Sequence, residues 1–201
     1  MTVERVVLVD SRGGEWADRY AVLRGHITAL LSDVPIEHIG STSVPGMPSK
    51  DVVDVLVGVA CGDVAAAASR LEAAGFDLEG ARDGHAWLSS PHRAARTAVV
   101  HVVIHDGRQW RDRLDFRDLL RCSPEARDRY LAVKERAAAL ATGWGEYTAF
   151  KADTVTTLLA EYRAQQPGRM RQSGPHGSER RVPALRAADR GRARDVAADH
   201  R

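Results

Sequence analysis

The stretch from residue 36 to residue 59, IEHIGSTSVPGMPSKDVVDVLVGV, constrains the fold more than any other part of this chain. A short apolar run ends at the small residues Gly40–Ser43, a Pro-Gly turn follows, and a β-branched run extends from Val52 to Val59. This order predicts a strand, a loop and a second strand. Glycine and serine leave backbone N–H groups and hydroxyls uncovered, so the loop can approach an anionic group closely.

The second predicted strand contains a single carboxylate, Asp54, among apolar residues. An isolated buried carboxylate is costly, so Asp54 needs a partner, a metal ion or a ligand. Lys50 precedes it, where a cation could hold a phosphate or another anionic group beside the loop. The alternative for Lys50 is a solvated loop lysine. The alternative for Ser41, Thr42 and Ser43 is an ST-turn that only closes the loop.

These residues resemble a known family. The run HIGSTSVPG, followed by Lys50 and Asp54, is similar to the GrpB-like family, which is grouped with the nucleotidyltransferase superfamily. Further matches occur in the family's order over roughly residues 5 to 165, at Glu15–Trp16, His101, Phe116–Arg121, Tyr130–Lys134 and Tyr147–Lys151. The resemblance implies an α/β fold, with a nucleotidyltransferase-like mixed β-sheet flanked by helices and a C-terminal helical portion. The resemblance indicates the fold more firmly than it indicates the reaction.

The length of 201 residues suits one folded domain with a sizeable core. We expect the GrpB-like domain to cover residues 1–165 and an Arg-rich tail, residues 166–201, to be disordered, because the tail has too few hydrophobic residues to order itself. The domain sequence lacks a clustered stripe of basic residues, so we do not expect a nucleic-acid partner. The sequence leaves the oligomeric state open.

No segment approaches the roughly 20 consecutive apolar residues that span a bilayer. The N-terminal apolar run is short and charged, unlike a signal peptide. Cys61 and Cys122 have no metal-type spacing and are most simply free thiols in a reducing compartment. We therefore expect a cytoplasmic protein with no membrane partner.

Hydrophobic periodicity predicts the surrounding elements. Helices are expected over about residues 13–31, 64–74, 108–121, 124–142 and 146–164, and strands over about residues 5–9, 34–39, 52–59, 76–78, 85–89 and 97–104. Ser123 and Pro124 are typical of an N-cap and the first helical position. Trp16 falls on the apolar stripe of the first helix, which favours core packing over ligand contact.

The resemblance also implies a metal site. In the nucleotidyltransferase superfamily a Gly-Ser pair follows the first strand, and carboxylates on the next strand hold a divalent ion that bridges a nucleotide. By this likeness Gly40 and Ser41 are the pair, Asp54 is the metal ligand, and Mg²⁺ with a nucleotide is the cofactor. Leu56 stands where a second acid is expected, and Asp51 points to the opposite strand face. One acid predicts weak Mg²⁺ binding to the free protein.

His101 takes the place of a third acid on a neighbouring strand. A carboxylate beside an imidazole raises the histidine pKa and fixes its tautomer, so Asp54 and His101 are predicted to be a general acid/base pair. The alternative is a structural ion pair or a hydrogen-bonded core histidine. His105 follows on the same strand face at roughly 13 Å and cannot share a metal with His101. Val99 replaces a histidine that family members commonly carry.

The sequence therefore predicts a nucleotidyltransferase-like transferase that acts on a phosphate-bearing or otherwise anionic small molecule. The predicted binding residues are Gly40, Ser41, Thr42, Ser43, Lys50 and His38. His38 and Glu37 alternate along their strand, so only one of them faces the site. Other charged residues could line the cleft from the helical side or could be solvated; they are Arg117, Asp118, Lys134 and Lys151. The alternative function, favoured by the missing second acid, is a non-catalytic module that keeps the pocket to bind a ligand or to assist a partner protein.

Overall fold

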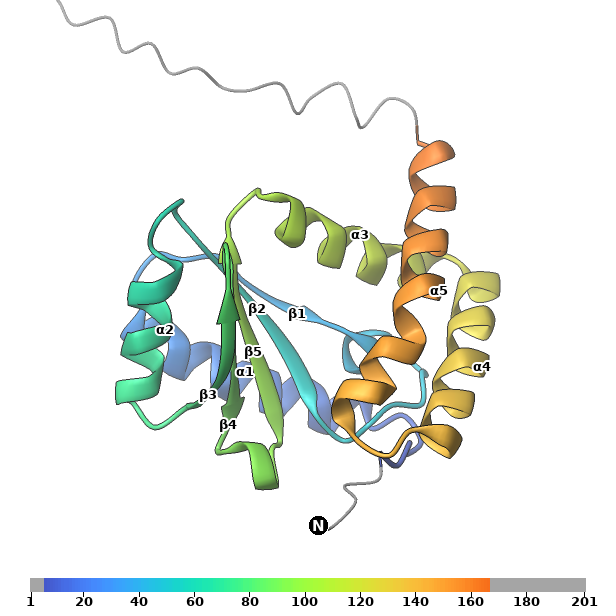
Figure 1. Ribbon diagram of the computed structural model, residues 1–201, viewed down its shortest axis with the longest axis horizontal. Helices are drawn as coiled ribbons and strands as arrows, with labels where there is room; N and C mark the ends of the chain where they lie inside the picture. The colour runs from blue at the N-terminus through green and yellow to red at the C-terminus, as the bar shows by residue number, and fades with distance from the viewer. Residues whose placement is uncertain (1–5, 167–201) are drawn as a thin grey trace, which may run out of the picture. The chain divides into compact units, whose positions relative to one another are not determined.

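A five-stranded mixed sheet is the centre of the part of the chain that the computed structural model describes, residues 6–166 (Figure 1). Its strands are β1 (Ile36–Ile39), β2 (Val53–Val59), β3 (Asp77–Arg82), β4 (His85–Ser90) and β5 (Ala98–Ile104). They lie in the order β1-β2-β5-β4-β3. The β2/β5 pair is parallel and the other neighbours are antiparallel. The predicted mixed sheet is thus confirmed, whereas the predicted disordered tail lies, beyond residue 166, outside the described residues.

One face of the sheet is covered by α1 (Gly13–Leu30) and α2 (Val64–Ala73) (Figure 1). Alternate residues of β2 point to this side and form a core with Trp16 and Leu71 from the two helices. Trp16 is fully buried, as its position on the apolar stripe predicted. This face is apolar, because each strand contributes aliphatic side chains to it.

The other face receives α3 (Arg108–Cys122), and α4 (Pro124–Leu140) and α5 (Trp144–Ala164) pack against each other beside it (Figure 1). Ser123 caps α4 by accepting a hydrogen bond from the Ala126 N–H, as predicted. Arg163 of α5 pairs with Asp112 and Asp115 of α3. These contacts fix the three helices over the face that carries the polar residues of β2 and β5.

The loop after β1 is held against these C-terminal helices. Val44 and Met47 of the loop are buried with Leu120 of α3, Tyr130 of α4 and Leu158 of α5. This apolar cluster places α4 and α5 beside the Gly-Ser loop, although they follow it by some eighty to a hundred residues in the sequence. The helices can therefore contribute side chains to any site at the loop.

Two strand predictions are corrected. The predicted strand over residues 5–9 is reduced, in its described part, to a single bridge between Val9 and Ser49. The strand predicted to end at Leu78 continues to Arg82 through an irregularity between Leu78 and Gly80, where Trp87 covers the glycine. Because this segment contains polar residues, its sequence did not indicate that it pairs with β4.

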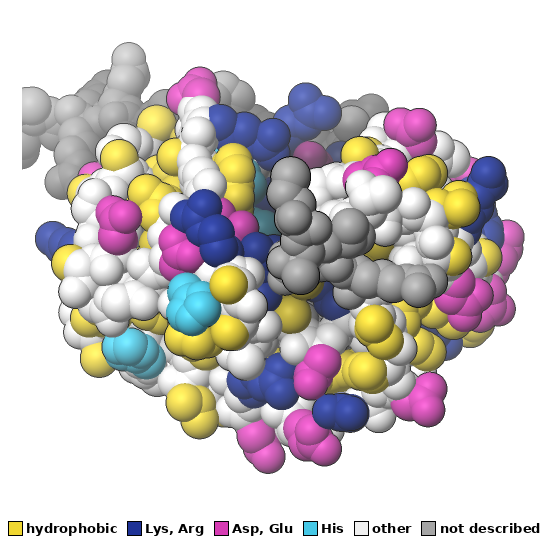
Figure 2. Space-filling model, turned by 60° about the horizontal axis from the view of Figure 1, so that its bottom comes forward, with side chains coloured by type: hydrophobic (Ala, Val, Ile, Leu, Met, Phe, Trp, Pro, Cys, Tyr) yellow, Lys and Arg dark blue, Asp and Glu magenta, His cyan; other side chains and the backbone are white. Residues whose placement is uncertain are grey.

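Two further observations concern the described residues as a whole. On the face seen in Figure 2, basic and acidic side chains are interspersed. Among the helices between residues 6 and 166, none is both long and apolar enough to cross a membrane.

Candidate functional site

The Gly-Ser loop approaches Asp54 through the backbone of Gly40. Gly40 has φ 69° and ψ −174° and begins the short 3-10 turn Ser41–Ser43. A Cβ atom on Gly40 would lie only 2.5 Å from the Asp54 Oδ2 atom. Only glycine therefore allows the loop to pass this close to the carboxylate.

The hydroxyls of the loop are largely engaged within it. Ser43 Oγ donates a hydrogen bond of 2.7 Å to the Gly40 carbonyl. Thr42 Oγ1 lies 3.0 Å from His38 Nε2. Ser41, Thr42 and Ser43 are all buried. The structure thus brings Gly40 to Asp54, whereas the Ser43 hydroxyl closes the turn and the Thr42 hydroxyl contacts His38.

His38 does not reach the predicted site. It pairs with Val55 across the sheet, and its ring stacks on Tyr20 of α1 at 4.8 Å on the opposite face from Asp54. Burial lowers the pKa of His38 to about 4, so it is neutral near pH 7. Glu37 lies on the Asp54 face instead, where it accepts a 2.7 Å hydrogen bond from Arg117. The register of β1 against β2 therefore places Glu37, and not His38, on the face of Asp54.

Asp54 is a charged residue in a mostly buried position. Its Oδ1 atom lies 3.2 Å from Lys50 Nζ and 3.9 Å from His101 Nε2. Burial alone would raise the pKa of Asp54, but Lys50 and His101 together hold it well below its usual range. Asp54 is therefore ionised. The structure places Asp54 and His101 side by side.

The pKa of His101 differs from the expectation. Burial outweighs the attraction of Asp54 and places the pKa of His101 below its ordinary value rather than above it. His85 of β4, which is not among the predicted site residues, lies beside His101, and burial lowers the pKa of His85 to about 3. Both imidazoles are neutral near pH 7 as a result. His85 could have been found from the sequence, because it lies in the predicted strand that precedes the strand of His101.

Two lysines complete the site from the helical side. Lys134 of α4 is 1% exposed and donates a 2.5 Å hydrogen bond to the Pro48 carbonyl. Lys151 Nζ of α5 lies 3.9 Å from the centre of the Tyr147 ring. Burial, reinforced by the nearby charge of Lys50, lowers the pKa of Lys134 and of Lys151 to about 7. We call Lys50, Asp54, His101, Lys134, Lys151 and Tyr147 the Asp54 site.

The lysine content of the chain marks this site. Among 29 basic residues, the only lysines are Lys50, Lys134 and Lys151, and the structure gathers all three here. Elsewhere the chain uses arginine, whose guanidinium stays charged, whereas a lysine changes its pKa readily when buried. Counting lysines against arginines would have favoured a site-lining position for Lys134 and Lys151 over the solvated alternative.

Aromatic residues line the helical side of the Asp54 site. Lys50 Nζ lies 4.6 Å, and the Arg96 guanidinium 4.3 Å, from the centre of the Trp144 ring. The Tyr147 hydroxyl is buried and has no hydrogen-bond partner within residues 6–166. A buried polar group without a partner is uncommon and needs an explanation, such as a ligand.

The residues present do not fit the Mg²⁺ site that the superfamily likeness implies. Asp54 is already paired with Lys50, and two further amines lie nearby. Leu56 is fully buried in an apolar cluster with Ile39. The described part of the chain contains no group of three His, Cys, Asp or Glu side chains able to hold a metal ion. Mg²⁺ prefers oxygen ligands and is bound through one or two carboxylates, whereas this amine-rich site has a single carboxylate that is already paired with Lys50.

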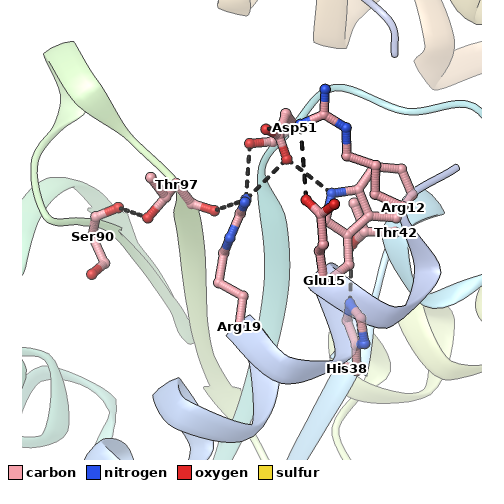
Figure 3. A network of polar contacts seen from close by, with 9 residues as sticks. Arg12, Glu15, Arg19, His38, Thr42, Asp51, Ser90 and Thr97 are labelled. Carbon is pink, nitrogen blue, oxygen red and sulfur yellow. Dashed lines mark hydrogen bonds and ion pairs between the residues drawn. The ribbon is translucent and has the colours of Figure 1, made fainter. Parts of the chain in front are cut away.

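Asp51 belongs to a separate, structural network (Figure 3). Its carboxylate accepts hydrogen bonds from Trp16 Nε1 at 2.9 Å and from Arg19 at 3.0 Å, and Arg12 lies at 3.3 Å. The Trp16 hydrogen bond and the two arginines lower the pKa of Asp51. The network ties α1 to the start of β2, so Asp51 does not complete a metal site with Asp54.

We expect Asp51→Ala to destabilise the protein without changing the Asp54 site. The variant leaves the buried Trp16 N–H without its acceptor, which should lower the free energy of unfolding by about 1–3 kcal/mol. Urea denaturation measures this loss. Anion affinity measured by calorimetry on the same variant should match the unsubstituted protein, and a large loss of affinity would show that Asp51 serves the site.

Fold and site together define an α/β protein with a cluster of amines built around one mostly buried carboxylate. The family model described as "GrpB protein" matches residues 5–161. The chain belongs to the GrpB family, which confirms the resemblance seen in the sequence. It is 46% identical over 156 residues to a UPF0157 protein of Deinococcus radiodurans, covering 78% of this chain and 82% of the relative.

A solved structure agrees with this assignment. The conserved protein GrpB from Enterococcus faecalis matches with a TM-score of 0.65 and 25% identity, covering 78% of this chain and 99% of that chain. Cid1 in complex with the UTP analogue UMPNPP matches more distantly, with a TM-score of 0.43, 14% identity, and coverage of 72% of this chain and 46% of Cid1. The second likeness is too distant to indicate an activity.

Proposed function

We propose that this GrpB protein is a nucleotidyltransferase-like transferase that acts on a phosphate-bearing or otherwise anionic small molecule at the Asp54 site. The observation that carries this proposal is the charge of the site, where three amines stand against one carboxylate. Positive charges are costly to bury without partners. An anionic ligand would supply the missing negative charge.

The hydrogen-bonding capacity of the site supports the same ligand class. A lysine ammonium has three N–H donors, and Lys134 uses one of them on the Pro48 carbonyl. Lys151 lies over the Tyr147 ring, and the Tyr147 hydroxyl is an unused donor. A phosphate group, which offers several acceptor oxygens, suits such a set of donors.

Asp54 and His101 are the proposed reacting groups. Asp54 is ionised and His101 is neutral, so the pair has one group that accepts a proton and one that can donate or accept. Where the ligand is a nucleotide, its own phosphates would have to hold Mg²⁺, because the residues of the site do not fit that ion. Two exposed free cysteines agree with the proposed cytoplasmic location.

Anion binding is tested with a double variant, Lys134→Met together with Lys151→Met. Inorganic phosphate, pyrophosphate and ATP are each added with Mg²⁺ and with EDTA, and thermal shift and calorimetry report binding. A ligand at 100 times its Kd should stabilise the protein by about 2.7 kcal/mol. Each lost charge-assisted hydrogen bond costs roughly 1.5–3 kcal/mol, so we expect the double variant to bind at least about 100-fold more weakly.

The matched control is Arg24→Met, which removes an exposed cation from α1, away from the site. It should bind the anion as the unsubstituted protein does. Circular dichroism confirms that all variants fold. The proposal is contradicted if none of these anions shifts the melting temperature, or if the double variant and the control bind equally well.

The second candidate is a non-catalytic module that binds the same anion for sensing or to assist a partner protein. The buried Leu56 in place of a second acid favours it. Turnover separates the two functions. Release of pyrophosphate from a nucleoside triphosphate, lost in Asp54→Asn, supports the enzyme, whereas tight anion binding with no turnover supports the module.

A further inference from the structure

A second histidine faces His101 on the sheet. His85 Nε2 of β4 lies 3.1 Å from His101 Nδ1 of β5, a hydrogen-bond distance. His85 is 3% exposed, and its Nδ1 atom is buried without a partner in the described part of the chain. On its other side His101 presents Nε2 to Asp54 at 3.9 Å. The three side chains thus form a row from the carboxylate to the second imidazole.

The ionised carboxylate biases the proton positions of this row, but at 3.9 Å from His101 Nε2 it is too distant to fix them by a hydrogen bond of its own. A carboxylate only accepts hydrogen bonds, so the His101 nitrogen that faces Asp54 is favoured as N–H. In a neutral imidazole the other nitrogen, Nδ1, is then an acceptor. The partner of that acceptor must be a donor, so His85 carries its proton on Nε2. The unpaired Nδ1 of His85 is left with its lone pair.

Two competing arrangements are weaker. Arg113 Nη2 lies 3.4 Å from His85 Nε2 and could donate to it, but this distance is longer than the 3.1 Å between the imidazoles. A shared metal ion between the two rings would be a second explanation of their spacing. The Arg113 guanidinium beside them opposes a cation there, and residues 6–166 supply no third ligand.

We propose that His85 is a positioning residue that fixes the tautomer of His101, with the proton on the nitrogen facing Asp54. The functional consequence rests on the proposed acid/base role of His101. In that role His85 presents a defined N–H of His101 to the reacting centre, as a hydrogen bond to one ring nitrogen selects the state of the other. Loss of His85 would leave His101 with a mixture of tautomers.

The tautomers are read directly from long-range proton–nitrogen spectra of protein labelled with ¹⁵N histidine. His101→Gln and His85→Gln variants assign the two rings among the 8 histidines of the chain. We expect both rings to carry their proton on Nε2 near pH 7. In His85→Phe the His101 nitrogen shifts should move toward those of a tautomer mixture.

Rescue distinguishes positioning from packing. The amide nitrogen of His85→Gln can occupy the place of Nε2 and donate to His101, so this variant should keep the His101 tautomer, whereas His85→Asn is too short and should lose it. Identical His101 shifts in the unsubstituted, Phe and Asn proteins would overturn the proposal, as would a proton on His101 Nδ1. Shifts that change on addition of EDTA would instead indicate a shared metal and also overturn it.

These spectra need no ligand, so their outcome is independent of the proposed function. A fixed tautomer with no anion binding would leave His85 as a positioning residue and remove the transferase. Anion binding together with an unchanged His101 tautomer in every His85 variant would support the anion-binding site and remove the positioning role of His85.

Discussion

Gly40→Ala should lower the free energy of unfolding by about 3 kcal/mol or more, a drop in Tm of roughly 6 °C or more for a protein of this size. Two effects combine. The φ of 69° and ψ of −174° lie in a region that is essentially limited to glycine and costs other residues about 1–3 kcal/mol. The added Cβ would also meet Asp54 Oδ2 at 2.5 Å and push the carboxylate away from Lys50.

Gly46→Ala is the matched control for this prediction. Gly46 also has a positive φ, 74°, but a Cβ there would have no atom within 4 Å. It should show backbone strain alone, about 1 kcal/mol. Urea denaturation of both variants measures the difference. Equal losses would show that the contact between the loop and Asp54 adds nothing to stability, and the described approach of Gly40 to the carboxylate would be wrong.

Lys134 and Lys151 should make anion affinity and stability respond to pH in opposite directions. Their folded pKa values of about 7 lie below the ordinary value of 10.5. The anion binds the charged amines, so its affinity should fall as pH rises through about 7, by up to about tenfold per pH unit for each lysine. Above that pH, binding requires the uptake of protons.

Stability of the ligand-free protein should change the other way. Between the folded pKa of about 7 and the unfolded value of 10.5, the unfolded chain binds more protons than the folded protein. Stability therefore rises with pH across this window, by up to about 1.4 kcal/mol per pH unit for each lysine. Subtracting the same curve for Lys134→Met isolates that residue. A difference curve that is flat in this window would contradict a depressed pKa for Lys134.

Local patterns predicted much of the fold. The strand, loop and strand from residue 36 to residue 59, the N-cap at Ser123 and the burial of Trp16 all depend on neighbouring residues, and the structure contains them. The strand predicted near the N-terminus was wrong for its described part, because pairing with a sheet depends on a partner that is distant in the sequence. The polar β3 was underestimated for the same reason.

The sequence predicted site residues from the loop and its strands, whereas it left Lys134 and Lys151 either lining the site from the helical side or solvated. Asp54 and His101 could be paired because β2 and β5 are neighbours in the implied fold. The placement of Lys134 and Lys151 depends on how α4 and α5 pack on Val44 and Met47, which no local pattern contains. The pKa of His101 depends on the depth of its burial, so a rule based on the neighbouring carboxylate gave the wrong direction.

The concentration of every lysine of the chain in the Asp54 site gives the folded protein an intrinsic reporter of its own opening. A protease that cuts only after lysine has three target bonds, one in the loop before β2 and the others within α4 and α5. In the native state all three lie in ordered structure, so cleavage requires the Asp54 site or the whole domain to open. An anion bound at the Asp54 site would slow that opening, and the pattern of fragments would show whether the loop, α4 or α5 separates first.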